Sequence, residues 1–135
     1  MMGNQITDYL AVGEMIRARI AAKLPTLTID SDRRDDSKAD SLPHVQIVYL
    51  GDDIVNTRSE FQIVNQVWGV VLSCDPPSDG TLVLSLLRAL HGLVLPQGYT
   101  PLKRVLIEDK PGESATGTMY YPFGFSTTFW YTFEE

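Results

Sequence analysis

Residues Phe61–Cys74 form a run of 14 positions without a charged side chain, and this run constrains the fold more than any other feature. Two-residue alternation divides its apolar residues between two faces. One face has Phe61, Ile63, Val67 and Val71, and the other has Val64, Trp68 and Leu72. A strand that is apolar on both faces is covered on both faces. We therefore expect this strand at the centre of a covered sheet or against a neighbouring subunit.

The segment 120–133 is the second long strand that the sequence predicts, because its residue types alternate strictly. One face has Phe123, Phe125, Phe129, Tyr131 and Phe133. This aromatic face suits a core. The opposite face, with Tyr120 and Trp130 among Ser and Thr residues, favours a contact with a partner, where aromatic residues concentrate.

Shorter patterns complete the order of elements. Spacing of three and four residues predicts helices from a cap at Thr7 or Asp8 to Leu24 and over 81–95. Alternation predicts strands over 26–30, 44–50 and 102–108, with Gly51-Asp52-Asp53 ending the second of them. The order predicts an α+β fold: one domain over 1–135, with a mixed or mostly antiparallel sheet of about four to five strands and two helices on one face.

Charge and composition restrict the partners. The 135 residues include 11 Lys plus Arg and 17 Asp plus Glu, for a net charge of −6. Nucleic-acid affinity comes from neutralising phosphates, so we expect no specific nucleic-acid binding. The most apolar stretch, 82–95, is shorter than the ~20 residues that a bilayer needs, so we expect no membrane contact. A single cysteine, Cys74, excludes an intramolecular disulfide framework, and we expect synthesis in a reducing cytoplasm.

Two polar segments, 31–42 and 109–118, are expected to be mobile loops of the kind that carry function. Asp30 and Asp32 suggest a calcium loop, but Arg33 and Arg34 stand where further ligands belong and no Glu closes the run. The sequence therefore predicts no metal site in this segment.

The sequence also predicts no catalytic residue and no cofactor. His44, His91 and Cys74 are more typical of structural residues. Glu108-Asp109-Lys110 faintly resembles the acidic-x-Lys step of metal-dependent nucleases, but Asp75 or Asp52 would have to supply a further carboxylate without a spacing that supports it. A metal-dependent hydrolase or nuclease that uses Glu108 and Lys110 is the alternative from another class.

Several segments in this order resemble the tail terminator (tail completion) proteins of tailed bacteriophages. They are Arg-Ala-Arg-Ile-Ala-Ala-Lys-Leu-Pro at 17–25, Pro-His-Val-Gln-Ile-Val-Tyr at 43–49 and Gln-Val-Trp-Gly-Val-Val-Leu at 66–72, followed by an apolar helix that opens with Asp-Gly and by the terminal aromatic strand. The resemblance covers most of the chain and rests on element order and residue texture.

The resemblance implies a structural virion protein at the head-proximal end of the tail, assembled in the host cytoplasm. Such proteins form a ring, commonly a hexamer, that caps the tail tube, stops its polymerisation and offers the joining surface to the head and neck. The implied partners are further copies of this chain, the tail tube protein and a head–neck connector protein, with a sheath protein as a further candidate. A head–tail connector or neck protein is the nearer alternative, and either tail type stays open.

Site residues follow from position within this implied ring. The two polar loops are expected to make axial contacts with the tail or neck, through Asp32, Arg33, Arg34, Asp35, Asp36, Lys110 and Glu113. Subunit contacts are expected at Trp68, Tyr120 and Trp130.

Overall fold

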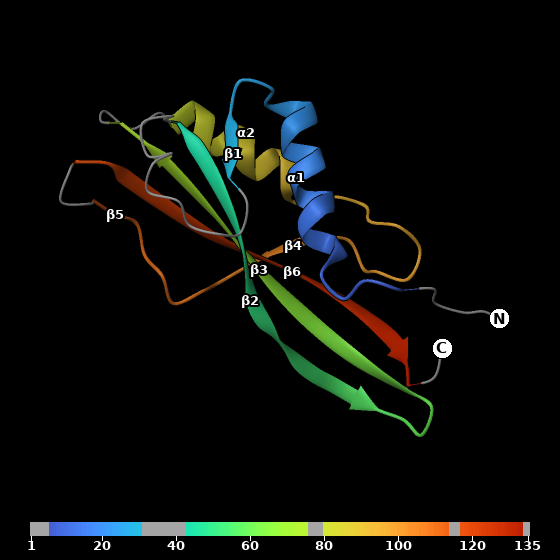
Figure 1. Cartoon of the computed structure of the whole chain (residues 1–135). Helices are drawn as coiled ribbons and strands as arrows, with labels where there is room; N and C mark the ends of the chain where they lie inside the picture. The colour runs from blue at the N-terminus through green and yellow to red at the C-terminus, as the bar shows by residue number, and fades with distance from the viewer. Residues whose placement is uncertain (1–5, 31–42, 76–79, 114–116, 134–135) are drawn as a thin grey trace.

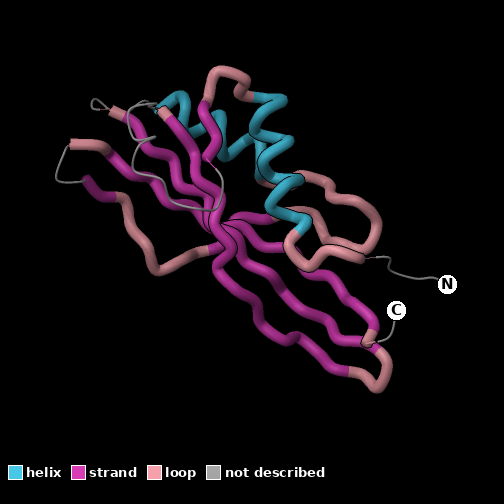
Figure 2. Tube along the Cα trace, in the orientation of Figure 1, coloured by secondary structure: helices cyan, strands magenta, loops and turns pink. Residues whose placement is uncertain are grey.

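Three strands of 14 residues each form the frame of the structure: β2 (His44–Thr57), β3 (Phe61–Cys74) and β6 (Met119–Thr132). The computed structural model describes residues 6–30, 43–75, 80–113 and 117–133. β3 pairs antiparallel with β2 on one side and with β6 on the other along its whole length. It is therefore the central strand of the sheet, as its charge-free sequence predicts (Figure 2).

Three short strands complete the described sheet, whose order is β1-β2-β3-β6-β4, with β5 also pairing β6. β1 (Thr28–Asp30) runs parallel to the start of β2, whereas β4 (Lys103–Val105) and β5 (Gly112–Glu113) run antiparallel to β6. The α+β prediction is confirmed. The described part of the chain has six strands where four to five were expected, because β5 forms inside the segment 109–118 that was expected to be only a loop.

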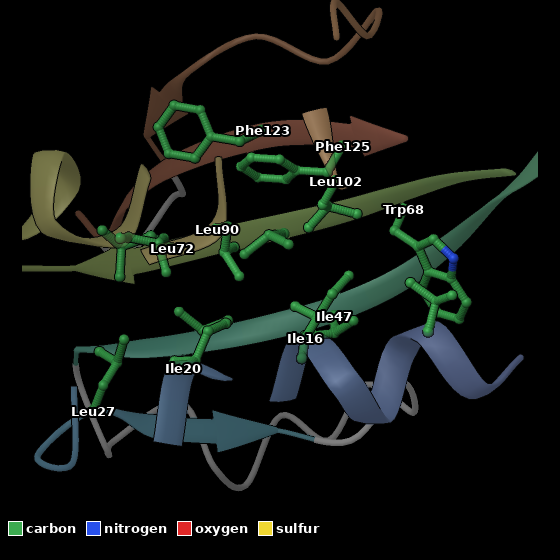
Figure 3. Close-up of a cluster of buried hydrophobic side chains, with 14 of the residues drawn as sticks. Ile16, Ile20, Leu27, Ile47, Trp68, Leu72, Leu90, Leu102, Phe123 and Phe125 are labelled. Carbon is green, nitrogen blue, oxygen red and sulfur yellow. The ribbon is translucent and has the colours of Figure 1, made fainter. Parts of the chain in front are cut away.

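Two helices, α1 (Ala11–Lys23) and α2 (Gly80–Leu90), pack on one face of the sheet (Figure 1). Their buried apolar residues meet one face of the three long strands, as Figure 3 shows for part of this core. The helices contribute Val12, Ile16, Ile20, Leu86 and Leu90, and the strands contribute Val45, Ile47, Trp68, Val70, Leu72, Phe123 and Phe125. This face is the one that the sequence assigned to Trp68 and Leu72 in β3 and to the phenylalanines in β6.

The strands are much longer than the helical layer. A strand of 14 residues spans about 45 Å, whereas the 13 residues of α1 span about 20 Å. In Figure 1 the hairpin that joins β2 to β3 and the C-terminal end of β6 extend past the helices. We call this part the projecting end, formed by residues 52–57, 61–66 and 127–132.

Element boundaries differ from the expectation where a local signal was misread. β2 does not end at Leu50: a register shift between Tyr49 and Gly51 lets the strand continue to Thr57. Gly51 has a φ of 111°, which suits a bulge rather than a chain reversal. α2 ends at Leu90 and not at residue 95, because Gly92 takes a φ of 78°.

The first helix approaches the sheet closely at Gly13. A Cβ added to Gly13 would lie 2.7 Å from Cζ3 and 2.9 Å from Cη2 of Trp68. The indole cannot move away easily, because it is only 4% exposed and its Nε1 donates a hydrogen bond of 2.9 Å to Gln66 Oε1. The missing side chain of Gly13 therefore allows α1 to pack on the buried tryptophan.

We expect Gly13→Ala to lower the free energy of unfolding by about 1–2 kcal/mol, because the overpacking outweighs the gain in helix propensity. Urea denaturation followed by tryptophan fluorescence measures this change. Gly80→Ala is the control, since a Cβ there meets nothing within 4 Å, and it is expected to be neutral or stabilising. Equal stability of the two variants would contradict this account of the α1 contact.

Candidate subunit interface

The face of the sheet opposite the helices is mainly apolar, and no described helix lies on it. Its half-buried apolar side chains are those of Val48, Phe61, Ile63, Val67, Val71, Tyr120, Pro122 and Trp130, and the polar side chains of His44, Gln46, Asn65 and Thr128 are half-buried among them. We call this surface the open face. The three long strands place a single charged residue on it, Asp53.

Strand register gathers these side chains into one continuous surface. Ile63 lies opposite Trp130, Val71 lies opposite Pro122, and the rings of Phe61 and Trp130 approach to 5.3 Å. The alternation that buries Val64, Trp68 and Leu72 under the helices necessarily directs their neighbours to the open face. The open face is therefore a consequence of the same register that forms the core.

Two glycines let other side chains lie flat across the open face. A Cβ on Gly69 would lie 3.1 Å from Cδ1 of Leu50, and a Cβ on Gly124 would lie 2.4 Å from Cγ2 of Ile107. Leu50 remains 44% exposed, however, and Leu106, the neighbour of Ile107, is fully exposed. The side chains of Leu50 and Ile107 therefore cover part of the open face and extend its apolar area.

The projecting end, with Phe133 directly after β6, adds further exposed apolar residues. Ile54 is 64% exposed, Val55 is 58% exposed and Phe133 is 51% exposed. On the outer side of β2, β1 pairs only with His44–Gln46. Among the described residues, the outer edge of β2 is thus unpaired beyond Gln46, and it offers free backbone groups as well as apolar side chains.

Tyr9 ties the segment before α1 to the helix-side face of the projecting end. Its ring packs on Phe129 and Tyr131 at centroid distances of 5.4 and 5.8 Å. Gln66, which is fully buried, donates a hydrogen bond of 2.6 Å to the Tyr9 carbonyl oxygen. The Tyr9 hydroxyl donates to a carboxylate oxygen of Asp52. This segment therefore takes over the cover of the sheet where the helices end.

The two tyrosine hydroxyls that share Asp52 are harder to ionise than usual. Tyr49 also donates a hydrogen bond, of 3.1 Å, to the same oxygen of Asp52. Burial raises the pKa of Tyr9 and of Tyr49, and the hydrogen bond to the Asp52 carboxylate raises the pKa of both further. The cluster fits a structural clamp that works with protonated phenols.

Trp68 does not lie at a contact surface, contrary to the expectation. It is 4% exposed and packs between Gly13 and the ring of Tyr49, 5.1 Å away, so it belongs to the helix-covered core. Tyr120 and Trp130 are half-buried on the open face, where the sequence placed them, and their role in a subunit contact stays a prediction.

The expected contact loops are described only in part. Asp32, Arg33, Arg34, Asp35 and Asp36 lie outside the described residues. Lys110 and Glu113 are exposed, and Glu113 pairs with Met119 in the sheet. A contact of either residue with a tail or neck component stays a prediction.

The structure brings no catalytic group together among the residues it describes. Glu108, Asp109 and Lys110 are exposed, and Asp52, one proposed partner carboxylate, is bound to the two tyrosines instead. Cys74 is buried and His91 is exposed. No group of three or more His, Cys, Asp or Glu that could hold a metal ion occurs in the described ranges. In those ranges, too, no helix has the length and hydropathy to span a bilayer.

Sequence reasoning missed the exposed residues of the extended β2 and the Tyr9 clamp. The continuation of the strand through Ile54 and Val55 was hidden by the turn-like Gly51-Asp52-Asp53, although Ile54 and Val55 are typical strand residues. Comparison with known proteins identifies no relative: no protein-family model matches the sequence, and a search of curated proteins finds no significant match.

The clamp predicts a pH dependence of stability. A tyrosine ionises at about pH 10 in the unfolded chain, and the folded pKa of Tyr9 is higher. The unfolded state therefore loses this proton first, and the free energy of unfolding should fall as the pH rises above about 10. Asp52→Asn removes the charge that raises the folded pKa and should make this fall smaller. Urea denaturation between about pH 9 and pH 11 tests it, with Asp53→Asn, on the opposite face, as the control.

Proposed function

We propose that this chain is a structural subunit of a phage tail: a tail terminator that forms a ring on the end of the tail tube, stops its polymerisation and provides the joining surface to the head and neck. The open face is the observation that favours this function. It is an apolar surface on the longest strands, and no described helix covers it. An assembly supplies the cover that no described helix provides.

The size of the open face fits a subunit contact. Three strands, about 4.8 Å apart and about 45 Å long, cover a footprint of roughly 650 Å². Stable protein interfaces bury about 800 Å² on each partner, with aromatic residues at their centre. The pair of Phe61 and Trp130, whose rings lie 5.3 Å apart, provides an aromatic cluster at one end of this face, on the projecting end.

The charge of the chain is consistent with this role. A net charge of −6 on each subunit gives a ring with a strongly negative field, and such a field repels DNA that passes through it. Together with the resemblance in element order, the open face and the charge support a ring-forming tail component rather than an isolated globular protein.

The self-association is tested by two neighbouring substitutions on opposite faces of β6. Trp130→Asp places a charge on the open face and should leave the circular dichroism spectrum unchanged while it weakens self-association at least about tenfold, measured by sedimentation equilibrium. Phe129→Asp is the matched variant: Phe129 is 2% exposed and packs on Tyr9 and Tyr99, so this change should unfold the chain. A wild-type chain that stays monomeric at high concentration, or a Trp130→Asp variant that associates normally, contradicts the proposal.

The role at the tail is tested by removing the gene from the phage that encodes it. Without a terminator, the tube protein should polymerise into tubes of uncontrolled length that do not join heads, as seen by electron microscopy. Tubes of normal length without attached heads would favour a neck or connector protein. Normal virions would contradict both functions.

A further inference from the structure

A basic hollow lies between α2 and β4, at the edge of the sheet opposite β2. It has a volume of about 490 Å³ and is lined by Leu84, Leu87, Arg88, His91 and Arg104. Three of these residues lie in α2 and His91 follows its last residue, Leu90. All four recur at intervals of three and four positions, so they lie on one side of this segment. No carboxylate is among the described residues that line the hollow, although the chain as a whole carries 17 acidic side chains.

The fold holds the two guanidinium groups at this hollow from separate elements. Arg88 lies in the last turn of α2. Arg104 lies in β4 opposite Phe125, and its guanidinium carbon sits 5.0 Å from the ring centroid of Phe123. Stacking covers the flat face of a guanidinium and leaves the N–H groups at its edge free to donate to an anion. The hollow therefore combines anion-binding groups with an apolar floor from Leu84 and Leu87.

The complementary surface occurs on the same chain, at the other edge of the sheet. Asp52 and Asp53 precede Ile54 and Val55 in β2, and all four are exposed. Asp52 is held by the two tyrosines, so Asp53 offers the carboxylate and the next two residues offer the apolar surface. By strand register Asp53 lies on the open face, opposite Asn65, and Ile54 lies on the other face, opposite Val64, so the unpaired edge of β2 presents the carboxylate on one side and an apolar side chain on the other.

A chain cannot place this segment in its own hollow. β3 and β6 lie between β2 and β4, which separates the two edges by about 14 Å. We infer that the hollow receives residues Asp53, Ile54 and Val55 of a second copy of this chain. The inference rests on the proposed self-association. It adds which two surfaces of neighbouring subunits meet.

This contact joins two different surfaces, the hollow of one subunit and the β2 segment of the next, and every subunit carries both. Such a head-to-tail arrangement closes into a ring when the rotation between neighbours divides a full turn. The charge pairing selects which edge meets which, since like edges repel each other. The hollow and the β2 segment therefore fit the geometry that a ring requires.

Charge reversal on each side tests the inference. Arg88→Glu alone and Asp53→Arg alone should each weaken self-association about tenfold or more in sedimentation equilibrium. An equimolar mixture of the two variants should restore it, because every interface in an alternating ring then pairs either the native residues or the exchanged ones. The double variant Arg88→Glu with Asp53→Arg should also associate.

The control is Lys23→Glu, which makes the same change in net charge in the last turn of α1 and should associate like the wild type. Circular dichroism checks the fold of every variant. Should Arg88→Glu be misfolded, Arg88→Gln replaces it and is expected to show a smaller loss. Normal association of the Arg88 and Asp53 variants, or a mixture no better than each variant alone, overturns the inference. If Trp130→Asp still weakens association in that case, the proposed ring stands and only its contact differs, whereas a monomeric wild type overturns both.

Discussion

A mismatch in length between the sheet and its helices governs this structure. The three long strands span about 45 Å, while α1 and α2, with 13 and 11 residues, span only about 20 and 16 Å. Helices that pack on one face cannot cover a sheet of that length, and the other face has no described helix at all. The core, the projecting end and the open face all follow from this mismatch.

The boundary between the covered and the projecting parts of the sheet depends on one polar residue, Gln66. Burying a side-chain amide costs free energy unless both its N–H group and its carbonyl oxygen form hydrogen bonds. Here Gln66 donates to the Tyr9 carbonyl oxygen and accepts from Trp68 Nε1, so it joins the segment before α1 to the core. From that point Tyr9 and Tyr99, which pack on Phe129, replace helices as the cover. These contacts thus join the projecting end to the core, although no described helix packs on its far part.

Sequence predicted the parts of the fold that depend on periodicity within one strand. Alternation predicted the boundaries of β3 and the residues on each of its two faces. It also predicted that Phe129 and Trp130 lie on opposite faces of β6. Trp68 was misplaced because alternation shows which residues share a face but not which face the helices cover. The extension of β2 was missed because a bulge with glycine uses the same residues as a turn. The hollow between α2 and β4 depends on tertiary packing, which no local pattern encodes.

An unpaired strand edge with exposed apolar residues is an aggregation hazard, and the β2 edge shows how this chain limits it. Register shifts after Tyr49 and after Ile54 interrupt the ladder, and Asp52 and Asp53 place charge beside the apolar residues. Bulges and charges of this kind prevent indiscriminate pairing of edges. They also restrict the edge to partners that offer positive charge at the right place. An edge with these features is suited to one specific neighbour, and a ring, which repeats a single contact until no edge is left, provides such a neighbour for every subunit.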